Sequence, residues 1–288
     1  MKADALLLLA ALIWGFAFVA QREGMAHLGP FSFNAFRFAL GALALAPFVL
    51  LGARRAGLRP ALLGGLQAGL ALYLGAGFQQ WGMVNTDAGK AGFITGLYVI
   101  VVPVLGGLEG RRTGYGTWLG ALLAVGGLFL LSVRPDWRIE YGELLVLGGA
   151  FFWAVHVLVI ARWTRRHDPL VIAFLQFATV AVLSAGLAIV HEHGLPFDLR
   201  GGAPSVLYAG LLSTAVAFTL QVVAQRQAPP AHAAVLLSLE AVFAALGGWW
   251  LLEEQLGGRR LAGCALMLVG MLASQLIGQR AAVRTHAG

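Results

Sequence analysis

The chain consists almost entirely of long apolar runs separated by short charged or Pro/Gly-rich breaks. A helix needs about 20 mainly apolar residues to cross the hydrocarbon core of a bilayer. The runs are continuous and do not alternate with polar residues, which favours helices over the strands of a barrel. We therefore expect an all-α polytopic membrane protein with ten transmembrane helices. The ten runs cover residues 4–21, 31–51, 61–83, 88–108, 115–133, 142–161, 169–190, 203–226, 229–251 and 259–279.

The composition agrees with lipid as the main solvent. Of 288 residues, 59% are hydrophobic and 11% are charged, and the mean hydropathy is +0.80. Soluble domains carry about 25% charged residues. The first run could be read as a cleaved signal peptide, but Trp14 and Phe16 lie late in it and many further runs follow, which favours an uncleaved first helix. The single cysteine, Cys264, excludes an intramolecular disulfide and a cysteine-based metal cluster.

The positions of lysine and arginine predict the orientation. With both termini in the cytoplasm, the inner segments carry twelve Lys and Arg residues and the outer segments seven, which favours N-in and C-in. The exception is Arg259-Arg260, which this topology places outside. The net charge of +7 comes from residues between apolar runs, where they face anionic headgroups, so no nucleic-acid partner is expected. Abundant Arg, Ala and Gly with little Lys indicates a GC-rich bacterial genome and a multi-pass protein of the inner membrane.

The two halves of the sequence align with each other. Each half holds five runs, an odd number, so the second half must enter the membrane upside down. Inverted repeats place a substrate site near the midplane, between halves that can rock. We expect a first five-helix repeat at 1–139, a second, inverted one at 140–280, and a disordered tail at 281–288. The alignment pairs Trp14 with Trp153 and Arg37 with Gln176 at an offset of 139 residues, and then Gln79 with Gln221, Lys90 with His232, Leu97 with Leu239 and Tyr98 with Glu240 at an offset of 142.

Two segments carry a resemblance to a known family. The residues from Leu236 to Leu246, followed by Trp249-Trp250-Leu251-Leu252-Glu253, resemble the ninth helix of EamA-type proteins of the drug/metabolite transporter superfamily. The usual form there is Leu-Glu-Pro-Val-Phe-Ala ending in Gly-Glu, and here Ala241 replaces the proline and Leu252 the glycine. The segment from Gly89 to Tyr98, with Pro103, is similar to that family's fourth helix. The resemblance covers the whole chain and implies an exporter or exchanger of amino acids, other metabolites, drugs, nucleotide sugars or triose phosphates.

Polar and aromatic residues inside the runs suggest a cavity. A charged side chain at the centre of a membrane helix costs about 2.5–3.5 kcal/mol on insertion scales and usually faces the protein interior. Glu240 lies mid-way along the ninth run, and its repeat partner Tyr98 lies mid-way along the fourth. An aromatic-walled cavity with a few polar anchors suits an amino acid. For each residue a structural or packing role remains the alternative. The candidate substrate-binding residues are Trp14, Tyr98, Trp153, His156, Glu240, Tyr73, Thr95 and Ser238.

Two symmetric polar clusters are candidate gates. Arg37, Gln79 and Lys90 are expected towards the outside, and their repeat partners Gln176, Gln221 and His232 towards the inside. Snorkelling at helix ends is the alternative for Lys90 and His232. For Arg37 the alternative is an interhelical structural contact.

The motifs of common enzymes are missing from the sequence. It has no Gly-x-Ser-x-Gly, His-Glu-x-x-His or P-loop, and His191-Glu192-His193 falls in a loop between runs. We expect no enzyme, no cofactor and no metal site, and a small-molecule substrate as partner beside the bilayer. The leading interpretation is a secondary exporter or facilitator of amino acids, including aromatic and hydrophobic ones. The alternatives are drugs, nucleosides or phosphorylated and nucleotide-sugar substrates, or a non-transporting assembly or sensor subunit. The substrate, the direction of transport, proton coupling, the oligomeric state and the resting conformation stay open.

Overall fold

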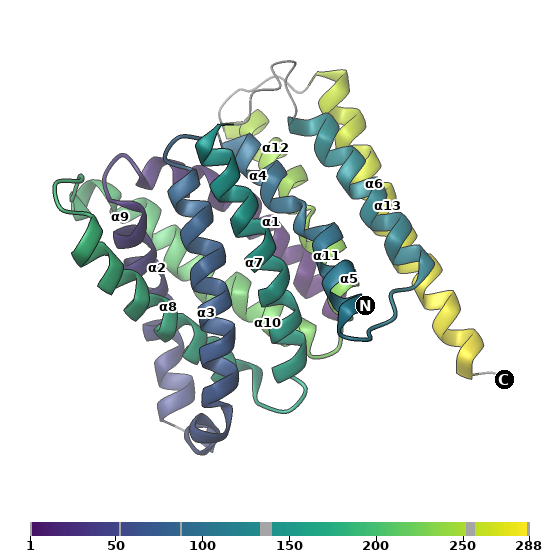
Figure 1. Ribbon diagram of the computed structural model, residues 1–288, viewed down its shortest axis with the longest axis horizontal. Helices are drawn as coiled ribbons and strands as arrows, with labels where there is room; N and C mark the ends of the chain where they lie inside the picture. The colour runs from purple at the N-terminus through teal and green to yellow at the C-terminus, as the bar shows by residue number, and fades with distance from the viewer. Residues whose placement is uncertain (1, 52, 87, 133–139, 252–256, 287–288) are drawn as a thin grey trace.

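The structure is a computed structural model that describes residues 2–51, 53–86, 88–132, 140–251 and 257–286 (Figure 1). Within these ranges the regular elements are helices, apart from one isolated bridge between Leu28 and Phe197. Seven helical segments are long and apolar enough to cross a membrane by length and composition. The prediction of an all-helical polytopic membrane protein is therefore confirmed.

Each of the ten predicted runs coincides with one helix or with a series of helices. Seven are single helices: α1 (Lys2–Gly24), α2 (Pro30–Leu50), α3 (Leu58–Gly82), α6 (Tyr115–Ser132), α7 (Tyr141–Trp163), α8 (Pro169–His191) and α13 (Gly258–His286). Three are composite: α4 (Ala88–Gly96) with α5 (Tyr98–Leu108), α9 (Leu199–Leu207) with the π-helix η2 (Tyr208–Phe218) and α10 (Thr219–Gln225), and α11 (Pro230–Leu237) with α12 (Glu240–Leu251). A short 3₁₀ helix, η1 (Ala53–Gly57), links α2 to α3. Helix α13 continues through residues 281–286, where the sequence predicts a disordered tail.

The fourth and ninth runs are both interrupted mid-way, at equivalent positions of the two halves. Leu97 separates α4 from α5, and Ser238 and Leu239 separate α11 from α12. At both breaks the backbone makes i→i−3 hydrogen bonds, from Leu97 N to Ile94 O (3.2 Å) and from Leu239 N to Leu236 O (3.2 Å). These 3₁₀ turns keep the backbone paired where the α pattern stops, as the membrane interior requires. The ninth run thus breaks although Ala241 stands where the family motif has proline.

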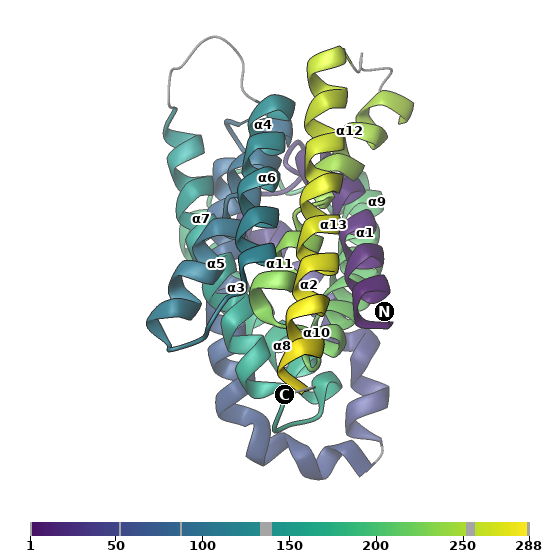
Figure 2. The same cartoon turned by 90° about the vertical axis from the view of Figure 1, so that its right-hand side faces the viewer.

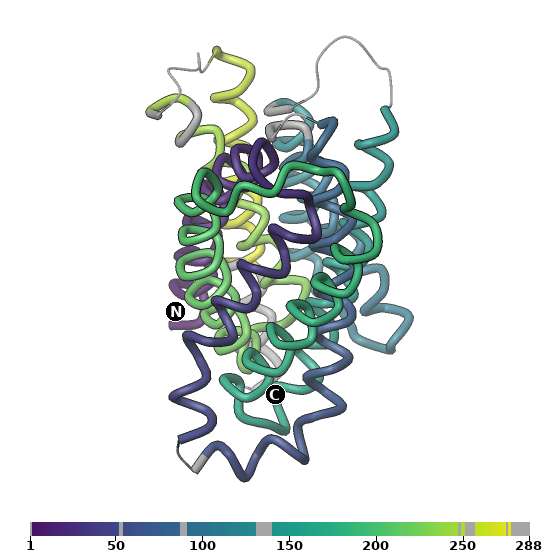
Figure 3. The backbone as a smooth tube through the Cα atoms, turned by 90° about the vertical axis from the view of Figure 1, so that its left-hand side faces the viewer, coloured from purple at the N-terminus to yellow at the C-terminus, as the bar shows by residue number. Residues whose placement is uncertain are grey.

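The helices of one half pack mainly against those of the other half. The main contacts of this kind have counterparts between the equivalent helices of the two halves. Helix α6 packs along α13, and α2 packs along α8 (Figure 2 and Figure 3). The contact of α3 with α7 has its counterpart in the contact of η2 and α10 with α1. Small residues permit this closeness: a Cβ on Gly120 of α6 would lie 2.6 Å from the carbonyl oxygen of Gly270 in α13.

The α2–α8 pair is tied at both ends by a carboxylate on a helix N-terminus, a favourable place for negative charge. At the start of α8, Asp168 accepts a hydrogen bond from Leu170 N (2.8 Å) and pairs with Arg54 (3.0 Å), which follows α2. At the start of α2 the N-cap is Gly29, and Glu192 from the end of α8 supplies the carboxylate instead, accepting from Phe31 N at 2.6 Å. A side chain on Gly29 would occupy the space of that carboxyl group.

Candidate functional site

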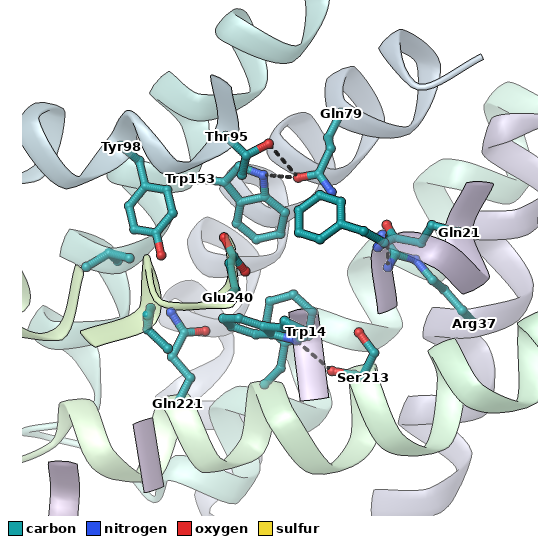
Figure 4. A pocket seen from close by; sticks show the side chains of 14 residues that line it. Trp14, Gln21, Arg37, Gln79, Thr95, Tyr98, Trp153, Ser213, Gln221 and Glu240 are labelled. Carbon is teal, nitrogen blue, oxygen red and sulfur yellow. Dashed lines mark hydrogen bonds between the residues drawn. The ribbon is translucent and has the colours of Figure 1, made fainter. Parts of the chain in front are cut away.

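A cavity lies at the centre of the bundle, between the two halves. Its volume is about 40 Å³, which is room for roughly one or two water molecules. Both broken runs contribute to its wall through Tyr98 and Glu240, the residues just after the two breaks (Figure 4). The full lining is Trp14, Phe18, Gln21, Arg37, Gln79, Thr95, Tyr98, Trp153, Val157, Ser213, Phe218, Gln221, Leu237 and Glu240.

Two tryptophans and a phenylalanine form the aromatic wall. The ring of Phe218 lies 4.6 Å from that of Trp14 and is stacked at 5.8 Å on that of Trp153, centroid to centroid. Each indole N–H is occupied: Trp14 Nε1 donates to the carbonyl of Ser213 (3.1 Å), and Trp153 Nε1 donates to Gln79 Oε1 (2.8 Å). With their polar edges satisfied, the tryptophans present apolar ring surface to a ligand.

Two ionisable side chains, one acidic and one basic, are buried at the cavity. Glu240, 5% exposed, is the first residue of α12, where a helix N-terminus favours a carboxylate. Arg37, 2% exposed, belongs to α2. Within the described part of the chain, the Glu240 carboxyl has no hydrogen-bond or ion-pair partner and Arg37 has no carboxylate partner. In Figure 4 Arg37 lies with Gln21 on one side of the cavity, and Glu240 lies between Trp14 and Tyr98 on the other.

The structure brings most of the predicted substrate-binding residues together. Five of them line the cavity, and three predicted gate residues line it too instead of forming separate clusters. Sequence reasoning missed Phe18 and Gln21, although they lie four and seven residues after Trp14 and therefore on the same helical face. It also missed Ser213 and Phe218, whose placement depends on the π-helix. The predicted residues at the cavity are Trp14, Thr95, Tyr98, Trp153, Glu240, Arg37, Gln79 and Gln221.

The other predicted site residues lie off the cavity. His156 is fully buried behind the rings of Trp153 and Phe218, and its Nε2 lies 2.9 Å from Gln176 Oε1. The Ser238 hydroxyl donates to the carbonyl of Val235 (2.9 Å) at the break before α12, so it completes the backbone pairing there. Tyr73 packs in an apolar cluster formed mainly by α2, α3 and α8. Lys90 belongs to α4, and its side chain lies outside the described part of the structure.

A second, larger cavity lies at the end of the bundle where α1 begins. Its volume is about 700 Å³, and we call it the vestibule. The predicted gate residue His232 lies here: its Nε2 is 3.0 Å from Asp4 Oδ1 and its Nδ1 is 3.0 Å from Ser274 Oγ. These contacts join the starts of α1 and α11 to α13. The cationic residues of the vestibule wall are Lys2, Arg111, Arg112 and Arg165.

The vestibule and the central cavity share the walls of α5 and α7. Tyr98 lines the central cavity and Val102, one turn further along α5, lines the vestibule. On α7 the neighbours Val157 and Leu158 divide in the same way. One helical turn advances roughly 5 Å. A thin apolar layer therefore separates the two cavities in this conformation.

Known proteins share the sequence pattern and the fold of this chain. A transporter of Archaeoglobus fulgidus is 32% identical over 272 residues, which cover 94% of this chain and 84% of that protein. The threonine/homoserine exporter RhtA of Escherichia coli is 29% identical over 166 residues, about half of each chain (54% and 53%). A solved crystal structure superposes with a TM-score of 0.80 at 21% identity, covering 96% of this chain and 98% of that chain, and shares the fold.

One family model matches two successive segments of the chain. The EamA-like transporter family matches residues 1–133 and again residues 140–274. Together the two matches cover nearly all of the described structure, including every residue that lines the central cavity. The resemblance seen around Glu240 and Tyr98 is thereby confirmed: the chain belongs to the EamA-like transporter family.

Proposed function

We propose that this secondary transporter moves amino acids, including aromatic and hydrophobic ones, across the bacterial inner membrane, and that it works as an exporter or facilitator. The observation that carries the proposal is the central cavity, where Glu240 is buried between the ring of Trp14 and the side chain of Tyr98. An aromatic wall with few polar anchors matches a small amphiphilic substrate. The partial similarity to an exporter of threonine and homoserine supports the same substrate class.

The mechanism that we propose is alternating access between two inverted halves, residues 1–139 and 140–280, in a ten-helix, N-in and C-in arrangement. The central cavity is formed by both halves, and at about 40 Å³ it is smaller than any amino acid in this conformation. The vestibule opens towards the proposed cytoplasmic end, because Arg111, Arg112 and Arg165 line it. Loading therefore requires the layer around Val102 and Leu158 to part, which rocking of the halves achieves.

Uptake of labelled amino acids into proteoliposomes tests the proposal, with and without a pH gradient. We expect saturable uptake that competes across the panel, and a loss of at least about tenfold in Glu240→Gln, because an anchor for the substrate is removed. Glu23→Gln is the matched control, since Glu23 is exposed at the end of α1. A monodisperse, normally melting Glu240→Gln variant shows that the loss is functional.

Two results would contradict the proposal. Absence of uptake for every amino acid by folded protein removes this substrate class and directs the search to drugs, nucleosides and phosphorylated metabolites. Equal uptake by wild type and Glu240→Gln removes Glu240 from the substrate site.

A further inference from the structure

Arg37 is an unusual residue for its position. It is 2% exposed, seven residues into a membrane helix, and its side chain lines the central cavity. A buried cation is costly without an opposite charge, and such residues usually mark a ligand or an ion path. The described part of the chain supplies no carboxylate for it: its hydrogen bonds run to neutral amide oxygens, from Nε to Asn34 (2.8 Å) and from Nη1 to Gln21 (3.3 Å).

These neutral partners hold the guanidinium in place without cancelling its charge. Asn34 is itself tied to α3, because its Nδ2 donates to the carbonyl of Ala76 (3.2 Å). The ring of Phe38 lies 4.6 Å from Arg37 Cζ and adds a cation–π contact. The cation is therefore positioned before any ligand arrives, with its charge still to be matched.

The repeat shows that the fold itself does not require a cation at this place. The equivalent residue of the second half is Gln176, a buried neutral amide that lies 2.9 Å from His156 Nε2. An amide thus fits the same position in the same kind of helix. The charge of Arg37 is a feature of one half alone.

Glu240 is the acidic side chain on the other side of the cavity, and its carboxyl group has no hydrogen-bond or ion-pair partner in the described residues. A cation at one side, a carboxyl group at the other and aromatic rings between them match the groups of a zwitterion. We propose that Arg37 binds the carboxylate of the substrate, so that the protein selects molecules that carry a carboxylate together with an amine facing Glu240. This inference rests on the proposed transport of amino acids and names the residue that sets its selectivity.

The same charges disfavour a phosphate group in this cavity. A phosphate dianion is matched by several cations, whereas Arg37 is the cationic side chain that lines the central cavity in the described structure. Glu240 would repel a second negative charge. A single carboxylate, which an arginine fork can bind through two hydrogen bonds, fits better.

The test compares three molecules that share one side chain: an amino acid that the protein transports, the amine left after removal of its carboxylate, and the acid left after removal of its amine. Each competes against the labelled amino acid in proteoliposomes, and each is added to the purified protein in a thermal-shift assay. Wild type should prefer the amino acid over the amine by about 10- to 100-fold, the range of a charge-assisted hydrogen bond. Arg37→Gln should lose this preference through weaker binding of the amino acid, with the amine unchanged.

Variants and controls separate binding from folding. Arg37→Lys keeps the charge without the planar fork and should retain part of the preference. Arg162→Gln, on the exposed face of α7, controls for loss of an arginine elsewhere. If Arg37→Gln does not fold, the wild-type ligand series and Arg37→Lys still decide the question.

Three outcomes overturn the inference: no preference of wild type for the amino acid over the amine, equal weakening of both ligands in Arg37→Gln, or full preference in folded Arg37→Gln. Failure of the proposed function looks different, because no amino acid is then transported by wild type. In that case the thermal shift decides: stabilisation of wild type but not of Arg37→Gln by the deaminated acid supports a carboxylate site, and no stabilisation of either overturns it.

Discussion

At the scale of single residues, the central cavity is organised by side chains that satisfy one another's polar edges. Gln79 shows this most clearly, because its Oε1 accepts from Trp153 Nε1 (2.8 Å) and from Thr95 Oγ1 (3.4 Å). One amide oxygen therefore fixes a side chain from α7 and another from α4. A buried donor that loses its partner costs about 1–3 kcal/mol. Gln79 therefore both orients the ring of Trp153 and contributes to the stability of the folded protein.

Gln79→Met should lower the free energy of unfolding by about 1–3 kcal/mol, because it leaves the indole N–H of Trp153 unpaired. The matched experiment is a double-mutant cycle with Trp153→Phe, which removes that N–H. In the Phe background the Met substitution should cost less, giving a coupling energy of about 0.5–3 kcal/mol in denaturation in detergent. Additive effects of the two substitutions would show that the hydrogen bond does not contribute.

At the scale of helices, the two ends of the α2–α8 pair use different chemistry for the same purpose. One end has a carboxylate in its own N-cap, Asp168, which is paired with Arg54. The other has Gly29, and a carboxylate reaches it from α8 through Glu192. Because both ends are joined, α2 and α8, which belong to different halves, should stay in contact when the halves rock.

Glu192→Ala should destabilise the protein by about 0.5–2 kcal/mol, the usual cost of losing a helix N-cap acceptor, since Phe31 N and Ser32 N lose their partner. Arg54→Ala should cost at most about 1 kcal/mol, because the Arg54–Asp168 pair is more than a third exposed and water screens it. Melting temperatures of the two variants in one detergent test this order. The reverse order would mean that the cap from Glu192 is not formed.

The positions of the helices could be predicted from the sequence, whereas their internal form could not. Each apolar run corresponds to a helix or a helix series, since length and hydropathy decide what spans a bilayer. Hydropathy does not distinguish between backbone hydrogen bonds of the i→i−3, i→i−4 and i→i−5 types. The breaks at Leu97 and Leu239, and the π-helix that carries Ser213, could therefore not be predicted from it.

The candidate site shows a similar limit. Trp14, Tyr98, Trp153 and Glu240 could be identified because each is polar or aromatic near the middle of a run. Arg37 was predicted as part of a gate towards the outside, from its repeat pairing with Gln176, yet it lines the central cavity. The position of a residue along its helix does not determine whether its side chain reaches the cavity, because this also depends on how the neighbouring helices pack against it.

At the scale of the whole molecule, the two cavities differ in size and in lining, which bears on the proposed direction of transport. The central cavity measures about 40 Å³, whereas the vestibule, at the end where α1 begins, measures about 700 Å³ and has Lys2, Arg111, Arg112 and Arg165 in its wall. With N-in topology, the wide side faces the cytoplasm, from which an exporter takes its substrate. If the predicted orientation is correct, the loading of substrate from the cytoplasm would follow from the position of the vestibule.

Thiol labelling should establish this topology. In a Cys264→Ser background, a membrane-impermeant maleimide should modify His193→Cys in intact cells and Arg166→Cys only after permeabilisation, because the two exposed residues lie in loops at opposite ends of α8. The opposite pattern would reverse the orientation, and labelling of both in intact cells would contradict a spanning α8.

The divergence of the two halves has a consequence for the cargo itself. Two identical halves would place the same residues at both equivalent positions, and a guest molecule would then have two indistinguishable poses. In the proposed repeat alignment, Arg37 corresponds to Gln176 and Tyr98 corresponds to Glu240. If the proposed site is correct, we expect a single favoured pose, in which the same end of every guest molecule faces the vestibule.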